Sequence, residues 1–479
     1  MLRRLSLIGP VVLMLASCAG EAAPPPAPYT VALDQAIEDA LARREIPGAA
    51  VVVVEGDRVS YSRGHGKADL ETGRPMTDST PIVIGSTSKP ITGLAVLRLV
   101  QQNAVALDTP IARYIPEVRF ADPRAETMTL RHLLTNRSGL PVGFSGPAYQ
   151  RPSIVDDGAL ERLVRTMAAE PLLFAPGEGY AYSNRGWALA GYVVQRVSGL
   201  SIETFLSREV FAPLGMTSTT LEFWTVPNLT TGYRDGYRTR NHPGLPSVAR
   251  DYGPSGMVVS TARDMARLLV AMLNDGRTED GRQFLTPELI REALRGQASA
   301  ESELGGPTHY GLGWEVDSSF GALTVKKAGS VSTMVTFWVI LPERRTAVGF
   351  AFNREDYGSI PLVGSVLSIV AGGEAMPVAP WSGTPPAIPA PVGISGAALD
   401  RWAGRYDTRF GYTSFTRQGD SLVTDFEGVD SRLVATSDST FVIDSDIVKH
   451  AGRVFTFRRR GAATVVSIDK DSLGVRMAP

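Results

Sequence analysis

A serine and a lysine three residues apart carry the strongest chemical signal in this sequence. In Ser86-Thr87-Ser88-Lys89 the first and last side chains stand one helical turn apart and share a helix face. Lysine is rare in the chain, because six of the 48 basic residues are Lys and the other 42 are Arg. A guanidinium stays protonated at any working pH, whereas a buried ammonium can lose its proton and become a base. The pair therefore predicts a serine nucleophile, Ser86, that Lys89 activates.

A second motif could relay protons to this pair. Tyr182-Ser183-Asn184 is the one Tyr-x-Asn of the chain, and it follows a loop that contains Pro and Gly. The Tyr182 hydroxyl could pass protons between serine, substrate and leaving group. The Asn184 amide could hydrogen-bond both Lys89 and a substrate carbonyl. Taken alone, such a motif more often marks an ordinary buried tyrosine.

A third motif could add positive charge. Lys327-Ala328-Gly329-Ser330 lies at the end of a predicted strand over 322–328. Lys327 would bring positive potential to the nucleophile and attract an anionic substrate group. Gly329 would let a substrate backbone approach closely. In isolation, the pair Lys326-Lys327 fits a solvated strand end.

Other chemistries find little support. A second Ser-x-x-Lys, Ser467 to Lys470, falls in a predicted strand, where this spacing puts the two side chains on opposite faces. The chain has no Gly-x-Ser-x-Gly, Gly-rich phosphate loop or dinucleotide fingerprint. Five scattered histidines and one cysteine give no metal-ligand spacing, so we expect neither metal nor cofactor. A net charge of −1 without a basic stripe argues against a nucleic-acid partner.

A scaffold must bring these three motifs together. Hydrophobic spacing predicts an α+β domain whose antiparallel sheet takes strands from both ends of the domain. Long loops at 140–157 and 225–254 are expected to form lids or binding walls. The expected elements are, in order, a helix at 31–45, a hairpin of strands at 49–54 and 58–63, a helix starting at or just after Ser86, mostly helical structure over 105–259, strands at 322–328, 334–341 and 346–352, and a helix at 358–371.

A Pro-rich stretch separates this domain from a different C-terminal pattern. Beyond the stretch, short alternating runs predict a small all-β barrel or sandwich. The expected strands are 412–417, 422–426, 432–435, 441–443, 453–458 and 463–468.

The N-terminus predicts export. Two arginines at positions 3 and 4 precede an apolar run at 5–15 that is too short to cross a bilayer comfortably. The run ends in Leu-Ala-Ser-Cys at 15–18, which resembles the lipobox of bacterial lipoproteins and makes Cys18 the candidate lipidation site. We therefore expect a lipid anchor in the bacterial cell envelope that faces the periplasm. A plain secretory signal and a twin-arginine signal are the alternatives.

The three chemical motifs, in this order and spacing, resemble the serine β-lactamase and penicillin-binding protein family, above all its class C branch. The resemblance covers about residues 30–375 and implies a β-lactamase-like domain, a sheet flanked by helices plus a helical subdomain. Four further segments reinforce it and receive no chemical role: 46–49, 129–141, 255–264 and 310–314.

The resemblance implies a role for each site residue. Ser86 would be the acylated nucleophile, and Lys89 and Tyr182 would share general acid and base work. Asn184, Lys327, Ala328 and Gly329 would contact substrate. The backbone N–H groups of Ser86 and Ser330 would form the oxyanion hole. The family usually carries Thr or Ser where this chain has Ala328, so a hydroxyl that helps to hold a substrate carboxylate is missing, and Ser330 is a possible substitute.

The C-terminal region resembles the lipocalin-like barrel appended to some family members. There such a barrel shapes the active site or assembles oligomers, and a purely stabilising appendage is the alternative here. The predicted domains are a signal peptide at 1–17, a Pro-rich tether at 18–29, a serine hydrolase domain at 30–375, a linker at 376–395 and the barrel at 396–479.

Four functions are compatible with these residues. The first hypothesis is a serine hydrolase that forms an acyl-enzyme on small peptides or amides. The others are a carboxylesterase with the same machinery, a weak β-lactamase, and a catalytically silent cell-wall binding lipoprotein whose barrel holds the ligand. The intact set of site residues favours an enzyme over the silent protein. Substrate and oligomeric state are not predicted.

Overall fold

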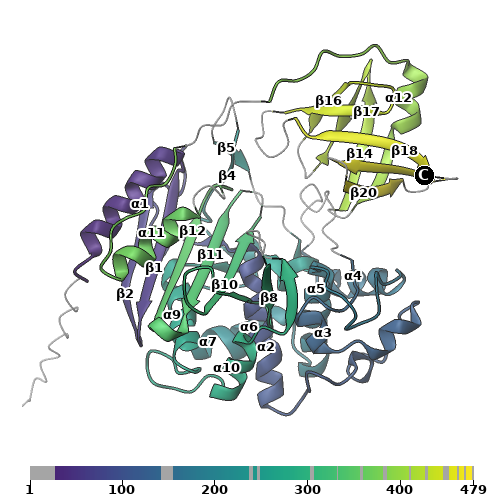
Figure 1. Cartoon of the computed structure of the whole chain (residues 1–479). Coiled ribbons are helices and arrows are strands. Elements are labelled where there is room, and N and C mark those ends of the chain that lie inside the picture. Colours follow the sequence, from purple (N-terminus) through teal and green to yellow (C-terminus); the bar gives the residue numbers. More distant parts are fainter. Residues whose placement is uncertain are drawn as a thin grey trace, which may run out of the picture.

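A computed structural model gives the fold of two domains that follow one another along the chain (Figure 1). It describes residues 27–141, 155–236, 241–244, 249–301, 307–331, 333–356, 360–380, 386–408, 411–426, 430–445, 452–460, 463–468 and 471–476. The predicted signal peptide, Cys18 and most of the expected loop at 140–157 lie outside these residues. Within them, no helix combines the length and apolar character needed to cross a membrane.

The first domain is built on an eight-stranded antiparallel sheet with the order β2-β1-β12-β11-β10-β9-β8-β7. This order confirms that the two ends of the domain share one sheet, since β1 pairs with β12 from Ala49↔Phe352 to Glu55↔Thr346. The strands are β1 (Gly48–Glu55), β2 (Arg58–Gly66), β7 (Ala298–Glu301), β8 (Pro307–Tyr310), β9 (Glu315–Asp317), β10 (Thr324–Ser330), β11 (Val335–Leu341) and β12 (Thr346–Phe352).

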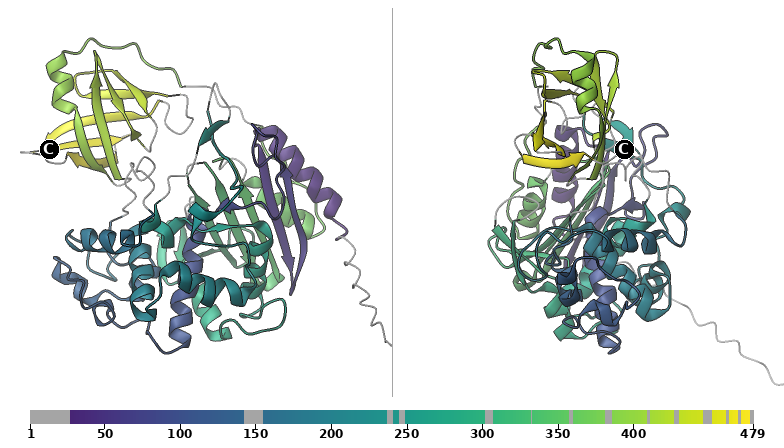
Figure 2. Two further views of the ribbon diagram at one scale, coloured as in Figure 1. Left: turned by 180° about the vertical axis from the view of Figure 1, so that it is seen from behind. Right: turned by 90° about the vertical axis from the view of Figure 1, so that its right-hand side faces the viewer.

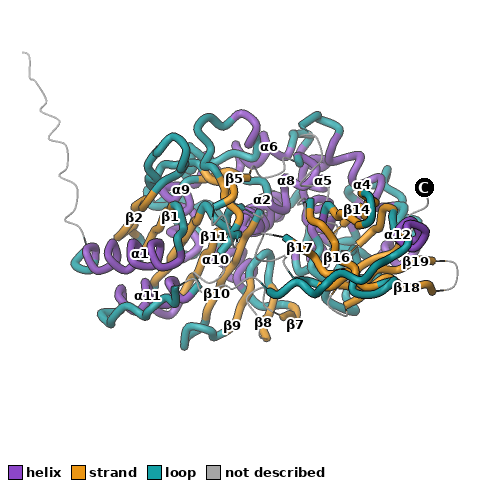
Figure 3. The backbone as a smooth tube through the Cα atoms, turned by 90° about the horizontal axis from the view of Figure 1, so that it is seen from above, coloured by secondary structure: helices purple, strands orange, loops and turns teal. Residues whose placement is uncertain are grey.

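Helices cover both faces of this sheet, as the view from above shows (Figure 3). One face packs on α1 (Thr30–Arg44) and α11 (Pro361–Val370), and the other packs on α9 (Ala262–Leu273) and the helical subdomain. Val51 and Val53 of β1 join the first core, and Val52 and Val54 join the second. This double burial explains why β1 is a continuous β-branched run rather than an alternating one.

The helical subdomain lies between the hairpin and β7 in sequence, as predicted. The interval 225–254, expected to be one long loop, instead contains a hairpin and a short helix. The elements are β3 (Ile82–Val83), α2 (Ser88–Gln101), α3 (Leu130–Leu134), α4 (Ala159–Ala168), α5 (Asn184–Ser198), α6 (Ile202–Leu206), α7 (Ala212–Leu214), β4 (Gly232–Arg234), β5 (His242–Gly244), α8 (Gly253–Gly256), β6 (Val259–Ser260) and α10 (Pro287–Leu294).

The C-terminal domain is a closed all-β barrel, which confirms the predicted fold class. Its strands are β13 (Gly404–Thr408), β14 (Gly411–Gln418), β15 (Ser421–Thr424), β16 (Ser431–Ala435), β17 (Thr440–Asp444), β18 (Val454–Arg460), β19 (Ala463–Ile468) and β20 (Asp471–Arg476), preceded by α12 (Gly396–Trp402). The sequence missed β13 and β20, and these two strands pair with each other to close the barrel. Two further views show the barrel at one end of the molecule (Figure 2).

Aromatic side chains fill the barrel. Phe415, Phe441, Phe455 and Phe457 are at most 1% exposed and belong to one core cluster. Edge-to-face contacts join them, with ring centroids 4.9 Å apart for Phe415 and Phe457 and 5.6 Å apart for Phe441 and Phe457. This packing favours a barrel with a solid core over the ligand-holding barrel of the silent-protein hypothesis.

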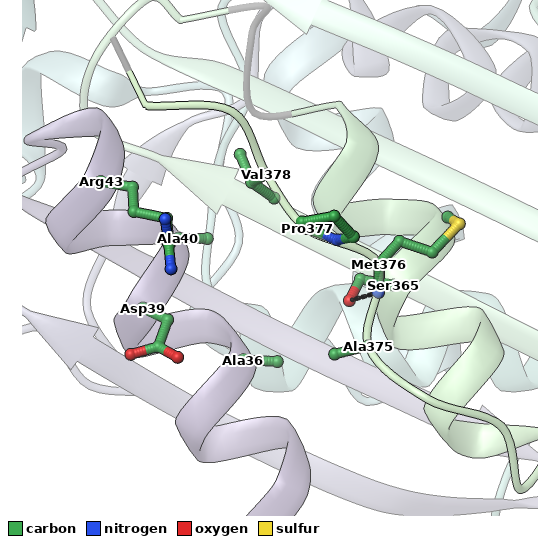
Figure 4. A pocket seen from close by; sticks show the side chains of 9 residues that line it. All are labelled: Ala36, Asp39, Ala40, Arg43, Ser365, Ala375, Met376, Pro377 and Val378. Carbon is green, nitrogen blue, oxygen red and sulfur yellow. Dashed lines mark hydrogen bonds between the residues drawn. The ribbon is translucent and has the colours of Figure 1, made fainter.

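The start of the expected linker packs on the first domain. The Met376 amide donates a hydrogen bond to Ser365 Oγ at 2.9 Å, and Val378 is buried with the core under α1 and α11. These residues border a surface pocket of about 140 Å³ between the two helices, with Asp39 and Arg43 on its other side (Figure 4). The chain therefore leaves the first domain a few residues after the predicted boundary at 375.

Candidate active site

The nucleophile lies where strand β10 meets the turn before α2. Gly85, Ser86 and Thr87 form a 3₁₀ turn, and α2 begins at Ser88, just after Ser86 as predicted. Gly85 has φ +56°, and a Cβ on it would lie 2.5 Å from the Ser330 amide nitrogen. A Cβ on Gly329 would lie 2.8 Å from the Ser86 amide nitrogen. Two glycines thus let the two amides proposed for the oxyanion hole come together.

Lys89 is fully buried and bonded on three sides. Its Nζ donates to Ser86 Oγ at 2.9 Å, to Asn184 Oδ1 at 2.7 Å and to the backbone carbonyl of Ser255 at 2.7 Å. These contacts aim the amine at the nucleophile, because a long flexible side chain with three acceptors has little rotamer freedom left. The Ser255 carbonyl is a partner that sequence analysis missed.

Tyr182 completes the hydrogen bonding at Ser86. Its hydroxyl donates to Ser86 Oγ at 2.8 Å. Two ammonium groups lie over its ring, Lys89 Nζ at 4.7 Å and Lys327 Nζ at 5.2 Å from the centroid. The structure therefore brings Ser86, Lys89, Tyr182, Asn184 and Lys327 into one cluster.

The loop before α5 holds Tyr182 and Asn184 in place. Ser183 caps the helix, since its Oγ accepts from the Gly186 amide at 3.1 Å and donates to the Pro141 carbonyl at 2.7 Å. Asn136 supports the same loop, because its Oδ1 accepts from the Ser183 amide at 3.3 Å and its carbonyl accepts from the Ala181 amide at 2.9 Å. The segment 129–141 thus positions the second motif.

Lys326 and Lys327 are both buried, which corrects the interpretation of this pair as a solvated strand end. Lys327 is 0% exposed, and its Nζ lies 3.9 Å from Glu315 Oε1 on β9 and 5.5 Å from the Tyr310 ring centroid on β8. Lys326 is 4% exposed and pairs with Asp317 at 2.7 Å. Burial alone would raise the pKa of Asp317, but the hydrogen bond from Lys326 lowers it below the ordinary value.

The structure places the side chain of Ala328, a predicted substrate contact, in the core. Successive side chains of a strand point to opposite faces, so Ala328 points away from the face of Lys327. It is 4% exposed, lies opposite Phe337 of β11 and belongs to the core beneath α1 and α11. A hydroxyl at this position would lie in an apolar layer. Ser330 Oγ donates to Glu355 Oε1 at 3.0 Å.

The sequence also matches a known protein family. A family model described as Beta-lactamase matches residues 33–361. The chain belongs to this family. It is a serine hydrolase of the β-lactamase family.

Individual relatives add detail. Esterase EstB of Burkholderia gladioli is 33% identical over 338 residues, which cover 62% of this chain and 83% of the esterase. Protein flp of Staphylococcus aureus (strain N315) is 28% identical over 191 residues, covering 40% of this chain and 38% of flp. The solved structure titled "Structure of the octameric penicillin-binding protein homologue from Pyrococcus abyssi" matches with a TM-score of 0.63 and 21% identity, covering 93% of this chain and 99% of that chain. This last likeness concerns the fold.

Three groups of this β-lactamase-family site were not predicted from the sequence: the Ser255 carbonyl, the Tyr310 ring and the Glu315 carboxylate. Ser255 and Tyr310 lie in segments that were assigned to the scaffold, and Glu315 directly follows one of them. A carbonyl acceptor such as that of Ser255 has no sequence signal, because every residue carries one. Among the described residues, no group of three or more His, Cys, Asp or Glu could hold a metal ion.

Proposed function

We propose that the chain is a carboxylesterase that cleaves small, uncharged esters through an acyl-enzyme on Ser86. The observation that carries the proposal is the pair of hydrogen bonds at Ser86 Oγ, from Lys89 at 2.9 Å and from Tyr182 at 2.8 Å. An uncharged substrate fits because Lys327, the second cation beside the nucleophile, is fully buried and faces Glu315. The similarity to Esterase EstB supports the choice of an ester.

The contacts support a two-step reaction. Lys89, as the free amine, takes the Ser86 proton while Oγ attacks the ester carbonyl carbon. The Tyr182 hydroxyl gives its proton to the leaving alkoxide, and the alcohol departs. The Tyr182 oxygen regains a proton from the Lys89 ammonium through the hydrogen-bonded cluster. Water then attacks the acyl-enzyme with the same groups as base and acid, and Ser86 is restored.

The oxyanion is stabilised by backbone. The amides of Ser86 and Ser330 would hold the negative oxygen of each tetrahedral intermediate, and one such donor typically contributes about 10²–10³ in rate. Because Gly85 and Gly329 set the approach of the two segments, these donors are fixed before substrate binds. Fixed donors need no reorganisation during the reaction.

Small peptides and amides are the second candidate substrates. A peptide carbonyl could meet the same nucleophile, Ser86, and the same two backbone amides as an ester carbonyl. Amides are harder to cleave than esters with the same machinery, so a peptidase would also cleave activated esters. β-Lactam hydrolysis ranks lower, since Ala328 supplies no hydroxyl and faces the core.

Turnover of paired substrates tests the proposal. The purified protein and its Ser86→Ala variant would be assayed with p-nitrophenyl butyrate and with p-nitroanilides of D- and L-amino acids. An esterase cleaves the ester in a Ser86-dependent way and leaves all anilides intact. Ser86-dependent anilide cleavage would replace the esterase proposal with the peptidase, and the D/L ratio would give its stereochemical preference.

We further propose that the protein is exported and held in the cell envelope by a lipid on Cys18. The support is the apolar run at 5–15 followed by Leu-Ala-Ser-Cys, with Cys18 as the chain's one cysteine. A Pro-rich tether of the kind seen at 18–29 would hold the enzyme at a distance from the membrane. Fractionation of cells that produce the wild-type protein and a Cys18→Ala variant tests this proposal.

A further inference from the structure

We propose that Glu315 is a positioning residue that holds the Lys327 ammonium against the ring of Tyr182 and thereby sets the charge at the catalytic base. The inference rests on the proposed Ser86 chemistry but does not depend on whether the acyl donor is an ester or an amide. Glu315 acts through Lys327.

The location of Glu315 supports this role. It lies on β9 directly opposite Lys326 of β10, and opposite Tyr310 of β8 on its other side. Its carboxylate is 3.9 Å from Lys327 Nζ, and the two side chains are 3% and 0% exposed. A buried ammonium is costly unless a counter-charge or other polar partner compensates it. Glu315 supplies that counter-charge from the strand next to the site.

The surrounding groups explain why the charge matters. Tyr182 faces two ammonium groups, Lys89 from α2 and Lys327 from β10. Lys327 Nζ also lies 5.5 Å from the ring centroid of Tyr310 on β8, and Glu315 of β9 is the carboxylate that the described contacts place beside it. When Lys89 and Lys327 are protonated, Tyr182 and Tyr310 are neutral and Glu315 is ionised, the net charge of the cluster is +1. Release of one proton neutralises the cluster, and the reaction needs that release at Lys89.

The neighbouring strand pair offers a matched control. Asp317 lies two residues from Glu315 on the same short strand and pairs with Lys326 at 2.7 Å. The described contacts of the Asp317 carboxylate are with Lys326 and Ser319, whereas the carboxylate described beside Lys327 is that of Glu315. Replacing Asp317 therefore removes a comparable ion pair between the same two strands without changing the charge beside Tyr182.

The test compares Glu315→Gln with Asp317→Asn in the full-length protein. The measured quantity is the rate at which a fluorophosphonate, a general serine-directed reagent, labels Ser86 between pH 5 and 10. Removing the Glu315 charge favours loss of a proton from the base, so the acid limb of the Glu315→Gln profile should move down by about one pH unit. The Asp317→Asn limb should coincide with the wild-type limb. An unmoved or upward-shifted limb in Glu315→Gln, or an equal shift in both variants, would overturn the inference.

A second comparison covers the case in which Glu315→Gln does not fold. In a Lys327→Met background, Glu315 has no ammonium to position, so adding Glu315→Gln should change the labelling rate less than about twofold. A tenfold further loss in the double variant would show that Glu315 acts independently of Lys327 and would overturn the inference. Labelling does not require ester turnover, so an enzyme that is labelled but leaves esters intact contradicts the esterase proposal alone. A wild-type protein that is not labelled at Ser86 contradicts both.

Discussion

Replacing Gly329 with alanine should pull apart the two halves of the oxyanion hole. A Cβ at this position would lie 2.7 Å from the Thr87 amide nitrogen and 2.8 Å from that of Ser86, and it would clash with the Ile84 carbonyl oxygen. All three atoms are backbone, so no side chain can rotate away. Ordinary contact begins near 3.4 Å, and the Ile84 oxygen is the tightest of the three contacts, so β10 and the turn must separate by roughly 1 Å.

The expected cost is mainly catalytic. A displacement approaching 1 Å can lower a rate about 10²-fold, and complete loss of one oxyanion donor costs about 10²–10³. We therefore expect kcat for p-nitrophenyl butyrate to fall about 10²-fold in Gly329→Ala. Overpacking of this kind should also lower the free energy of unfolding by about 1–3 kcal/mol.

A second glycine near the site provides the control. Gly186 lies in the first turn of α5, and its nearest neighbours to an added Cβ, Leu133 O and Ser138 Oγ, are each 3.6 Å away. Gly186→Ala should therefore keep kcat within about twofold of wild type, since the contact is ordinary. Gly329→Ala with at least half of the wild-type kcat would show that the approach of Ser330 to Ser86 does not require a glycine at position 329.

Three further predictions concern the base, acid stability and localisation. Lys89→Arg should lower kcat at least about 10³-fold although the positive charge remains, because a guanidinium cannot accept the Ser86 proton; near-normal kcat would contradict the role of Lys89. Burial alone would raise the pKa of Asp356, but its hydrogen bond and ion pair with Arg44 hold the pKa below the ordinary value. The pair therefore adds stability above the unfolded-state pKa near 4, and this is lost as the pH falls through the folded-state pKa. Chemical denaturation should show the wild-type advantage over Asp356→Asn shrinking from pH 6 to pH 2, and a constant advantage would exclude this linkage. Cys18→Ala should move the protein from the membrane pellet to the periplasmic fraction, and a variant that stays in the pellet argues against the lipid anchor.

The elements with a strong hydrophobic period could be predicted from the sequence. The doubly buried run of β1 and the strands β11 and β12 carry long β-branched or aromatic stretches. Helix α1 shows its buried face at Leu33, Ile37 and Leu41. These patterns indicate which residues are buried, and the buried strands predicted the sheet that joins both ends of the domain.

The strands β7, β8 and β9 could not be predicted in the same way. They are four, four and three residues long, and their sequences, ASAE, PTHY and EVD, are rich in residues that disfavour strands. Pairing with a neighbouring strand, which the sequence does not display, makes them strands. Because β9 was not predicted, Glu315 was not recognised as part of the site. Its proximity to Lys327 depends on the register between β9 and β10.

Sequence motifs indicated the residues whose side chains could act in the site. They could not indicate contacts made by backbone groups, or the face of a strand on which a side chain lies. The motifs led to Ser86, Lys89, Tyr182 and Asn184, which the structure gathers around one hydroxyl. For Ala328 the motif gives the residue type but not the face of the strand, and the structure places its side chain in the core.

Trapping the acyl-enzyme shows whether Ser86 is the nucleophile. The protein would be mixed with p-nitrophenyl pivalate, whose bulky acyl group slows hydrolysis of the intermediate, then quenched in acid and analysed by intact and peptide mass spectrometry. We expect one added acyl group on the peptide that contains Ser86, and none in Ser86→Ala. An acyl group on another residue, or continued turnover by Ser86→Ala, would contradict this role of Ser86.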